Sequence, residues 1–310
     1  MKWIKKGKIC DHDSFALSWY RKNSMVPLPY LMGNRLRIFL TMCDSDNIGR
    51  IGFIDVDPEN PKKILGYSKL PIINIGDDGC FDDNGVVTAS LLRDGEKLYM
   101  YYSGYQKCVK VPYLIFTGVA VSLDNGLSFK KLSKRVPLLD RIEGESGTRC
   151  VPYVIKEGDV YRMWYTADSD NGWIDGPCKK KLPLYDLKHL TSTEATAWPR
   201  ENGAVAVGFK DKDEHGIAKC TLWKEAGAYK IIYSIRSLSK GYRLGYAESH
   251  DGIDFIRMDE SIGIDVSKTG WDSEMIAFAE RIEVKNRTYL FYCGNGYGMA
   301  GIGYAELVES

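Results

Sequence analysis

The sequence has almost no net charge, because 42 Lys and Arg residues are balanced by 41 Asp and Glu residues, leaving +1 at pH 7. A protein that binds duplex nucleic acid usually carries a basic excess or a basic stripe, and this chain has neither. No run approaches the 18 apolar residues of a membrane span, and no apolar segment follows the lysines of the first ten residues, as a signal peptide would require. We therefore expect a cytoplasmic protein with neither a nucleic-acid partner nor a membrane partner.

Motifs for metals, redox chemistry and cofactors are also missing. The eight cysteines contain no Cys-x-x-Cys pair, and none of the four histidines has ligand spacing with another. We therefore expect free thiols, no metal and no cofactor. The glycines of residues 294–298 follow a predicted strand without a helix after it, which argues against a dinucleotide or phosphate cradle.

Sustained helical periodicity is absent, and short aromatic strands recur instead, at residues 36–41, 98–103, 161–166, 229–234 and 288–293. Aligned on the residue before the final Ser, Thr or Cys, the copies are 62, 63, 68 and 59 residues apart, the aligned residues being Leu40, Tyr102, Tyr165, Tyr233 and Tyr292. Strand groups repeated at this period are typical of a β-propeller. We predict an all-β, five-bladed β-propeller that forms a single domain over residues 1–310, with more than about 40% strand and less than about 10% helix.

Two further features fit this pattern. Residues 118–129 and 245–255 read as strand, Asp/Gly turn and strand, and the first of them is similar to the Asp box of sialidase propellers, in which the Asp and Gly hold the turn. The Gly-, Pro- and Lys-rich stretch from Asp168 to Arg200 reads as an inserted loop at the rim of a pocket.

An acidic residue stands at nearly the same place in four repeats. The carboxylates lie 19 or 20 residues before the aligned aromatic residue, at Asp83, Glu145, Glu214 and Asp272. Equivalent positions on inner strands of a propeller face one axis, so we expect these four side chains to converge on one cavity, where mutual repulsion would raise at least one pKa. The alternative is that each acid pairs with a nearby cation, such as Arg149 or Lys219. The first repeat breaks the rule, with Tyr20 and Arg21 at this phase and Asn23 close by.

Five motifs with these repeats resemble the five-bladed β-propeller glycoside hydrolase superfamily, which includes families 32, 43, 62, 68 and 130. The similarity is closest to glycosidase-like proteins of bacterial surface-polysaccharide clusters, and the motifs lie at residues 23–27, 81–86, 140–149, 271–275 and 294–298. The resemblance implies a carbohydrate-active enzyme. One departure is Asn23, which stands in the region where families 32 and 43 carry a first-blade Asp, and an amide cannot act as a base. Family 130 phosphorylases, by comparison, need one protein acid and bind phosphate with basic side chains.

Glycosyl transfer needs an acid at the leaving oxygen and a carboxylate near the oxocarbenium-like centre. We expect Glu145 or Glu214 to be the acid and Asp83 to be the carboxylate. The expected substrate-binding residues are Asn23, Arg149, Lys219, Asp272, Glu274 and Tyr297, with Tyr297 the most exposed of the aromatic side chains near loops.

The sequence leaves hydrolysis, phosphorolysis and transfer open, and the ligand is expected to be a glycan or a nucleotide sugar. Two other hypotheses are a sugar-binding propeller without catalysis and a propeller that binds other proteins.

Overall fold

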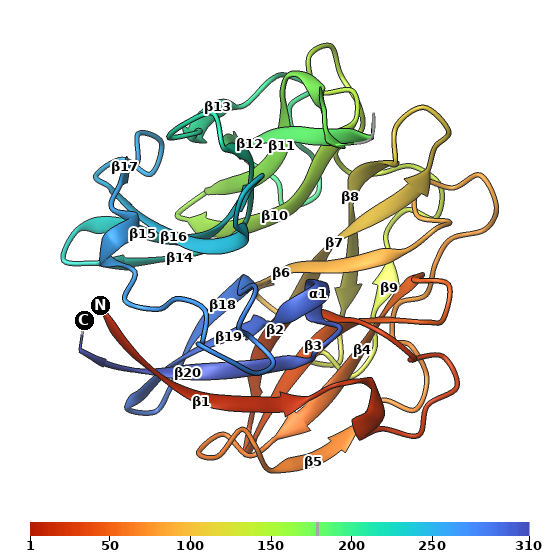
Figure 1. Cartoon of the computed structure of the whole chain (residues 1–310). Coiled ribbons are helices and arrows are strands. Elements are labelled where there is room, and N and C mark those ends of the chain that lie inside the picture. The colour runs from red at the N-terminus through yellow and green to blue at the C-terminus, as the bar shows by residue number, and fades with distance from the viewer. Residues whose placement is uncertain (178–179, 310) are drawn as a thin grey trace.

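The computed structural model describes residues 1–177 and 180–309, and in this part of the chain almost every element is a strand (Figure 1). Strands take up 57% of the chain, which confirms the all-β prediction. The helical segments that lie wholly within the described residues are a short turn, α1 (Asn295–Gly298), and the 3-10 turns His12–Ser14 and Asp259–Ser261.

The strands form five antiparallel units of four. Their bounds, in chain order, are as follows: β2 (Ser24–Met32), β3 (Arg35–Cys43), β4 (Gly49–Val56) and β5 (Ile64–Tyr67) in unit 1; β6 (Val86–Asp94), β7 (Lys97–Lys107), β8 (Tyr113–Ser122) and β9 (Lys130–Lys131) in unit 2; β10 (Thr148–Glu157), β11 (Val160–Asp175), β12 (Lys181–Ser192) and β13 (Ala204–Val207) in unit 3; β14 (Glu214–Glu225), β15 (Ala228–Ser237), β16 (Gly241–Ser249) and β17 (Ile256–Arg257) in unit 4; and β18 (Ala277–Val284), β19 (Arg287–Cys293), β20 (Ile302–Glu309) and β1 (Lys2–Cys10) in unit 5. Because β1 pairs with β20, unit 5 joins the two ends of the chain, which lie side by side in Figure 1.

The first strand of each unit, β2, β6, β10, β14 and β18, contacts its counterpart in the next unit, and β18 contacts β2, so these five innermost strands form a closed cycle. Each interface between consecutive units holds its own apolar cluster. Leu28 and Phe39 of unit 1, for example, pack with Val86 and Met100 of unit 2. Burial of these apolar faces is the main favourable contribution to the assembly of the ring.

Every innermost strand carries a bulge. The register shifts fall between Met25 and Leu28, Thr88 and Ser90, Cys150 and Tyr153, Ala218 and Cys220, and Ala277 and Glu280. Val26 and Val151 have φ of 51° and 40° at these points, a conformation that β-branched residues rarely adopt. A bulge bends the strand and redirects its side chains, and here it turns them toward the centre of the ring.

In units 1 to 4, the Ser or Thr that follows the aligned residue forms a hydrogen bond to the next unit. Thr41 Oγ1 accepts the Thr88 N–H at 3.0 Å and Ser103 Oγ accepts the Val151 N–H at 2.9 Å. Ser234 Oγ accepts the Phe278 N–H at 2.8 Å. The repeat found in the sequence therefore marks the hydrogen bonds that connect the bulges of one unit to the neighbouring unit.

The two Asp/Gly turns have the predicted structural role. Asp124 Oδ1 accepts the N–H groups of Leu127 and Ser128 at 3.1 and 2.9 Å. The Ser128 hydroxyl also donates to Asp124, and this bond, followed by those from the backbone, lowers the pKa of Asp124 to about 2. Asp251 holds the second turn in the same way.

The prediction of a loop over residues Asp168–Arg200 is wrong, because most of this range is strand. Strands β11 and β12 form a long hairpin that pairs Tyr161 with Ser192 at one end and Asp175 with Lys181 at the other. Its Gly and Pro residues suggested a loop, but Trp173 pairs opposite Pro183 within the ladder. Cys178 lies outside the described residues; the other seven cysteines are free thiols, as predicted.

Candidate functional site

A cavity of about 390 Å³ opens where the five innermost strands meet. Each of these strands contributes a wall residue at or near its bulge, and these residues are Val26, Val87, Val151, Ala218 and Phe278. The volume falls within the range of small-molecule sites. The ring of units thus builds one pocket from segments far apart in the sequence.

Tyrosines form much of the polar wall, at positions 105, 113, 185, 242 and 297. Tyr105 and Tyr113 meet edge to face with ring centroids 5.2 Å apart, and Tyr242 meets Tyr297 at 5.8 Å. The Tyr185 and Tyr242 hydroxyls lie 2.8 Å apart. Burial raises the pKa of Tyr105, Tyr113 and Tyr242, so their hydroxyls stay neutral and can donate hydrogen bonds.

Arg236 lies among these rings at the end of β15. Its Nη1 and Nη2 donate long hydrogen bonds to the Tyr185 and Tyr297 hydroxyls at 3.5 and 3.3 Å. The guanidinium lies 5.6 Å from the centre of the Tyr242 ring, within the range of a cation–π contact. A second cation, Lys107, lines the cavity as an exposed side chain.

Asn23 and Tyr297 are the two predicted site residues that line this cavity. The Asn23 amide donates to the carbonyls of Gly296 and Tyr297 at 2.7 and 3.0 Å, and so fixes the turn that carries the Tyr297 ring. Tyr297 is 43% exposed, as its place in a Gly-rich turn predicted. A Cβ on Gly298 would lie 1.9 Å from the Ser24 carbonyl oxygen, so only glycine fits beside this turn.

Other polar groups of the wall are neutral. Burial, followed by the neighbouring Asp44, raises the pKa of the Cys43 thiol to about 12, and burial also raises the pKa of Cys150 well above its usual range. The Thr148 hydroxyl is buried in the wall and makes no hydrogen bond to a described residue. No Asp or Glu is among the described residues that line the cavity.

The expectation that Asp83, Glu145, Glu214 and Asp272 converge on one cavity is therefore wrong. Glu145 is fully buried and forms ion pairs with Arg149 Nε at 2.6 Å and Lys188 Nζ at 3.0 Å. Asp272, 2% exposed, pairs with Lys5 at 2.7 Å. Glu145 and Asp272 do occupy equivalent places in their units, but each lies inside its own unit against a cation.

A hydroxyl from the aligned tyrosine completes each of these arrangements. Tyr165 donates to Glu145 at 3.0 Å and Tyr292 donates to Asp272 at 3.0 Å. In unit 2 the acid in this position is Asp82, which accepts the Tyr102 hydroxyl at 3.3 Å and the Lys131 ammonium at 2.5 Å.

Unit 1 lacks both members of the pair, since Leu40 replaces the tyrosine and no acid precedes it at this phase. The joint loss of hydroxyl and acid indicates that the repeated acid serves packing within the unit.

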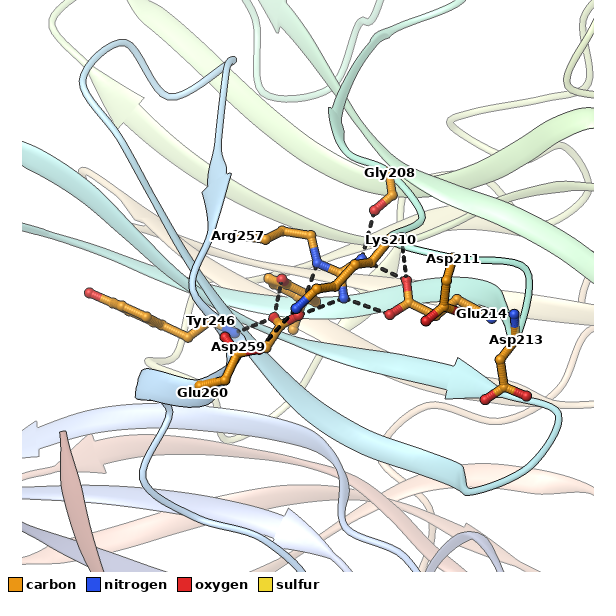
Figure 2. Close-up of polar contacts among 10 residues, drawn as sticks. Gly208, Lys210, Asp211, Asp213, Glu214, Tyr246, Arg257, Asp259 and Glu260 are labelled. Atoms are coloured by element: carbon orange, nitrogen blue, oxygen red, sulfur yellow. Dashed lines mark hydrogen bonds and ion pairs between the residues drawn. The ribbon is translucent and has the colours of Figure 1, made fainter.

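In unit 4 two acids, Glu214 and Asp259, take the place of one, and both bind Arg257, as Figure 2 shows. Arg257 binds Glu214 with both terminal nitrogens, at 2.6 and 2.7 Å, and also binds Asp259 at 2.7 Å. Asp259 accepts the Tyr233 hydroxyl at 2.6 Å. Because such bidentate pairs are strong and geometrically specific, Arg257 ties β17 to the start of β14.

Asp83 has a different environment from Asp82. Its Oδ2 accepts the Gly79 N–H at 2.9 Å, and its Oδ1 is buried without a hydrogen bond to a described residue. Asn84, the next residue, lines the cavity. Among the four predicted acids, Asp83 is therefore the one that directly precedes a cavity-lining residue.

The remaining predicted residues lie away from the cavity wall. Lys219 is fully buried and pairs with Glu280, which also accepts the Thr221 hydroxyl at 3.0 Å. Arg149, 1% exposed, donates hydrogen bonds to the carbonyls of Asp140 and Glu201 in addition to its ion pair with Glu145. Glu274 is exposed and contacts Arg243 through its backbone carbonyl.

Sequence reasoning missed Arg236, Lys107, Tyr185 and Tyr242. A usable signal was present, because the residue three places after each aligned position is Cys43, Tyr105, Asp168, Arg236 and Asn295 in the five repeats. Three of these, Cys43, Tyr105 and Arg236, line the cavity. Chemical differences among repeats, rather than the shared acids, mark the pocket.

In the described part of the chain, no three His, Cys, Asp or Glu side chains are grouped in a way that could hold a metal ion. None of its helices has the length and apolar character needed to cross a membrane.

Comparison with known proteins gives relatives that are similar in sequence over nearly the whole chain, and solved structures that share the fold at low sequence identity. The chain is 32% identical over 308 residues to the Uncharacterized protein MT1551 and to the Uncharacterized protein Rv1502, each from a strain of Mycobacterium tuberculosis, and the match covers 99% of each chain. No family model matches the chain.

Three solved structures illustrate the shared fold. A structure described as a glycoside hydrolase has a TM-score of 0.70 at 16% identity, and the match covers 97% of this chain and 91% of that protein. A thermostable family-43 glycoside hydrolase gives 0.70 at 14% identity, with 94% and 92% covered. A family-130 protein, from a group described as mannoside phosphorylases that includes hydrolases of β-1,2-mannosidic linkages, gives 0.69 at 14% identity, with 99% and 90% covered. Families 43 and 130 are five-bladed propeller glycoside hydrolase families, and at these identities the likeness concerns the fold alone.

Proposed function

This protein belongs to the same family as the mycobacterial proteins MT1551 and Rv1502, and we propose that it is a carbohydrate-binding protein whose ligand occupies the central cavity. In this proposal the five units are the blades of a five-bladed propeller, which forms one domain over residues 1–310. The ligand is a glycan or a nucleotide sugar.

The observation that carries the proposal is the composition of the cavity wall. Five tyrosines supply flat amphipathic faces and hydroxyls, which suit the apolar faces and the hydroxyl groups of a sugar. Arg236 adds a charged group whose two hydrogen bonds to tyrosine hydroxyls are long. Mostly apolar walls with a few placed polar groups are the usual design of a small-molecule site.

Binding is a better account than hydrolysis by two carboxylates. That mechanism needs an acid and a second carboxylate about 5–10 Å apart around the scissile bond. Neither Glu145 nor Glu214 lines the cavity, and each is engaged by Arg149 or Arg257. In this account the two glutamates stabilise their units.

A binding experiment tests the proposal. We would titrate the protein with a panel of mono- and oligosaccharides and nucleotide sugars by saturation-transfer NMR, and compare wild type with Tyr297→Ala. Tyr297 lines the cavity and is partly exposed, so its loss should weaken sugar binding by roughly tenfold, a normal cost for one aromatic contact.

Tyr67→Ala is the matched control, because it removes a tyrosine ring from β5, outside the cavity. The proposal fails if no member of the panel binds, or if the two variants lose affinity equally.

A second candidate function is glycosyl transfer or cleavage that uses one protein acid, and Asp83 favours it, because its Oδ1 has no partner among the described residues and its chain neighbour Asn84 lines the cavity. In this case Asp83→Asn should abolish turnover of a bound sugar donor while binding persists. Asp78→Asn, an exposed neighbour, is the control. Equal turnover in both variants would exclude Asp83 as the acid.

A further inference from the structure

Arg236 differs from every other arginine that is buried or half-buried in the described residues. Each of the others forms an ion pair with an Asp or Glu, and they are Arg37, Arg50, Arg149, Arg162, Arg243, Arg257 and Arg281. Arg236 contacts phenol hydroxyls and aromatic rings instead, and no described carboxylate lies within 4 Å of it. Its charge is thus left without a counter-ion inside the protein.

An unpaired guanidinium in a partly dry pocket is costly, because desolvation weakens the hydration of the charge without a compensating ion. A guanidinium has five N–H donors and keeps its proton in proteins. Two long bonds to Tyr185 and Tyr297 leave most of these donors unused. The planar donor fork matches the two oxygens of a carboxylate or a phosphate.

The remainder of the wall supports an anion and contains nothing that repels one. None of the described lining residues is acidic, and Lys107 adds a second positive charge. The neutral hydroxyls of Tyr113 and Tyr242, whose pKa values burial raises, are donors beside the same guanidinium.

We propose that Arg236 binds an anionic group of the ligand, so that the carbohydrate in the central cavity carries a phosphate or a carboxylate. This inference rests on the proposed carbohydrate-binding function and narrows its ligand class. The tyrosines contact the sugar, and Arg236 selects the acidic derivative over the neutral one. Sugar phosphates and nucleotide sugars supply phosphate, whereas uronates supply carboxylate.

The test uses calorimetric titration of the full chain with glucose, glucuronate, glucose 1-phosphate, UDP-glucose and inorganic phosphate. Wild type should bind at least one of the four anions at least about tenfold more tightly than glucose, in line with charge-assisted hydrogen bonds. The phosphate and carboxylate arms identify the source of the anion. Arg236→Gln should remove this preference, and Arg236→Lys, which keeps the charge without the fork, should restore part of it.

Arg243→Gln is the matched control, because Arg243 lies on the adjacent strand β16, pairs with Asp265 and does not line the cavity. The inference is overturned if glucose binds as tightly as every anion, or if Arg236→Gln keeps the anion preference, and in the first case the proposed function survives. Binding of inorganic phosphate alone, lost in Arg236→Gln, would support the anion site and contradict the sugar-binding function. Absence of all binding would refute both.

Discussion

At the scale of single residues, the repeated acids show how a regular pattern can be real and still be misread. Glu145 and Asp272 recur at a fixed distance before an aromatic residue because each accepts that tyrosine's hydroxyl. Glu145 pairs with Arg149, four residues later as the sequence alternative suggested, but its second cation, Lys188, and the cation of Asp272, Lys5, lie 43 and 267 residues away in the sequence. Phase along the sequence predicts a position within a unit, but it contains no information about a partner brought in by tertiary folding.

Glu145→Gln distinguishes a stabilising role from a catalytic one. The amide is similar in size to the carboxylate, and it leaves Arg149 and Lys188 buried without their counter-ion. We expect the free energy of unfolding to fall by about 3–5 kcal/mol, the usual cost of removing one partner of a buried pair. Urea denaturation measures this change.

Glu143→Gln, at an exposed position two residues earlier, should leave stability within about 0.5 kcal/mol of wild type. Sugar affinity should be unchanged in both variants while they remain folded. A Glu145→Gln protein of normal stability that had lost turnover of a sugar substrate would restore the catalytic role.

At the scale of elements, the bulges of the innermost strands connect local geometry to the site. Val26 and Val151 adopt positive φ where the strands bend, and both line the cavity. The neighbouring unit supports these bends through buried hydroxyls, as Ser103 does for the Val151 N–H. The aromatic repeat predicted the strands and the period, but the bulges have no comparable sequence signal, since Val normally favours regular extended backbone.

Ser103→Ala tests this support. The Val151 N–H would lose its acceptor in a buried site, at a cost of about 1–3 kcal/mol, and its amide should exchange with solvent faster. Ser90→Ala is the control, because the Ser90 hydroxyl is equally buried but makes no hydrogen bond to a described residue. Hydrogen exchange followed by NMR that finds the two variants alike would contradict a supporting role for Ser103.

The Asp124 turn gives a pH-dependent prediction. Its pKa is about 2 in the folded protein, below the ordinary 3.8, because hydrogen bonds from Ser128, Ser122 and Leu127 favour the carboxylate. A lowered folded-state pKa stabilises the protein above the unfolded pKa, and this contribution is lost as pH falls from about 4 through about 2.

Asp124→Asn should therefore flatten part of the decrease in stability over that range, as seen in urea unfolding at pH 5 and pH 2.5. The exposed Asp254→Asn is the control and should follow wild type. A steeper decrease in Asp124→Asn than in wild type would contradict the sign of this effect.

At the scale of the whole molecule, a ring of similar units encloses a pocket that is chemically asymmetric. Units 2, 3 and 4 supply Tyr105, Tyr185, Tyr242 and Arg236, whereas unit 1 supplies Asn23 and Cys43. The sequence repeat predicted the ring, because it depends on features that the units share. It could not predict the pocket, which depends on the positions where the units differ.

The most direct test of this account is a crystal structure of the protein with the acidic sugar that it binds most tightly. We expect the sugar in the central cavity, against the rings of Tyr113, Tyr242 and Tyr297. Its phosphate or carboxylate oxygens should lie about 2.7–2.9 Å from the Arg236 nitrogens, the distance of a charge-assisted hydrogen bond. A sugar bound outside this cavity, or one whose acidic group points away from Arg236, would contradict the account.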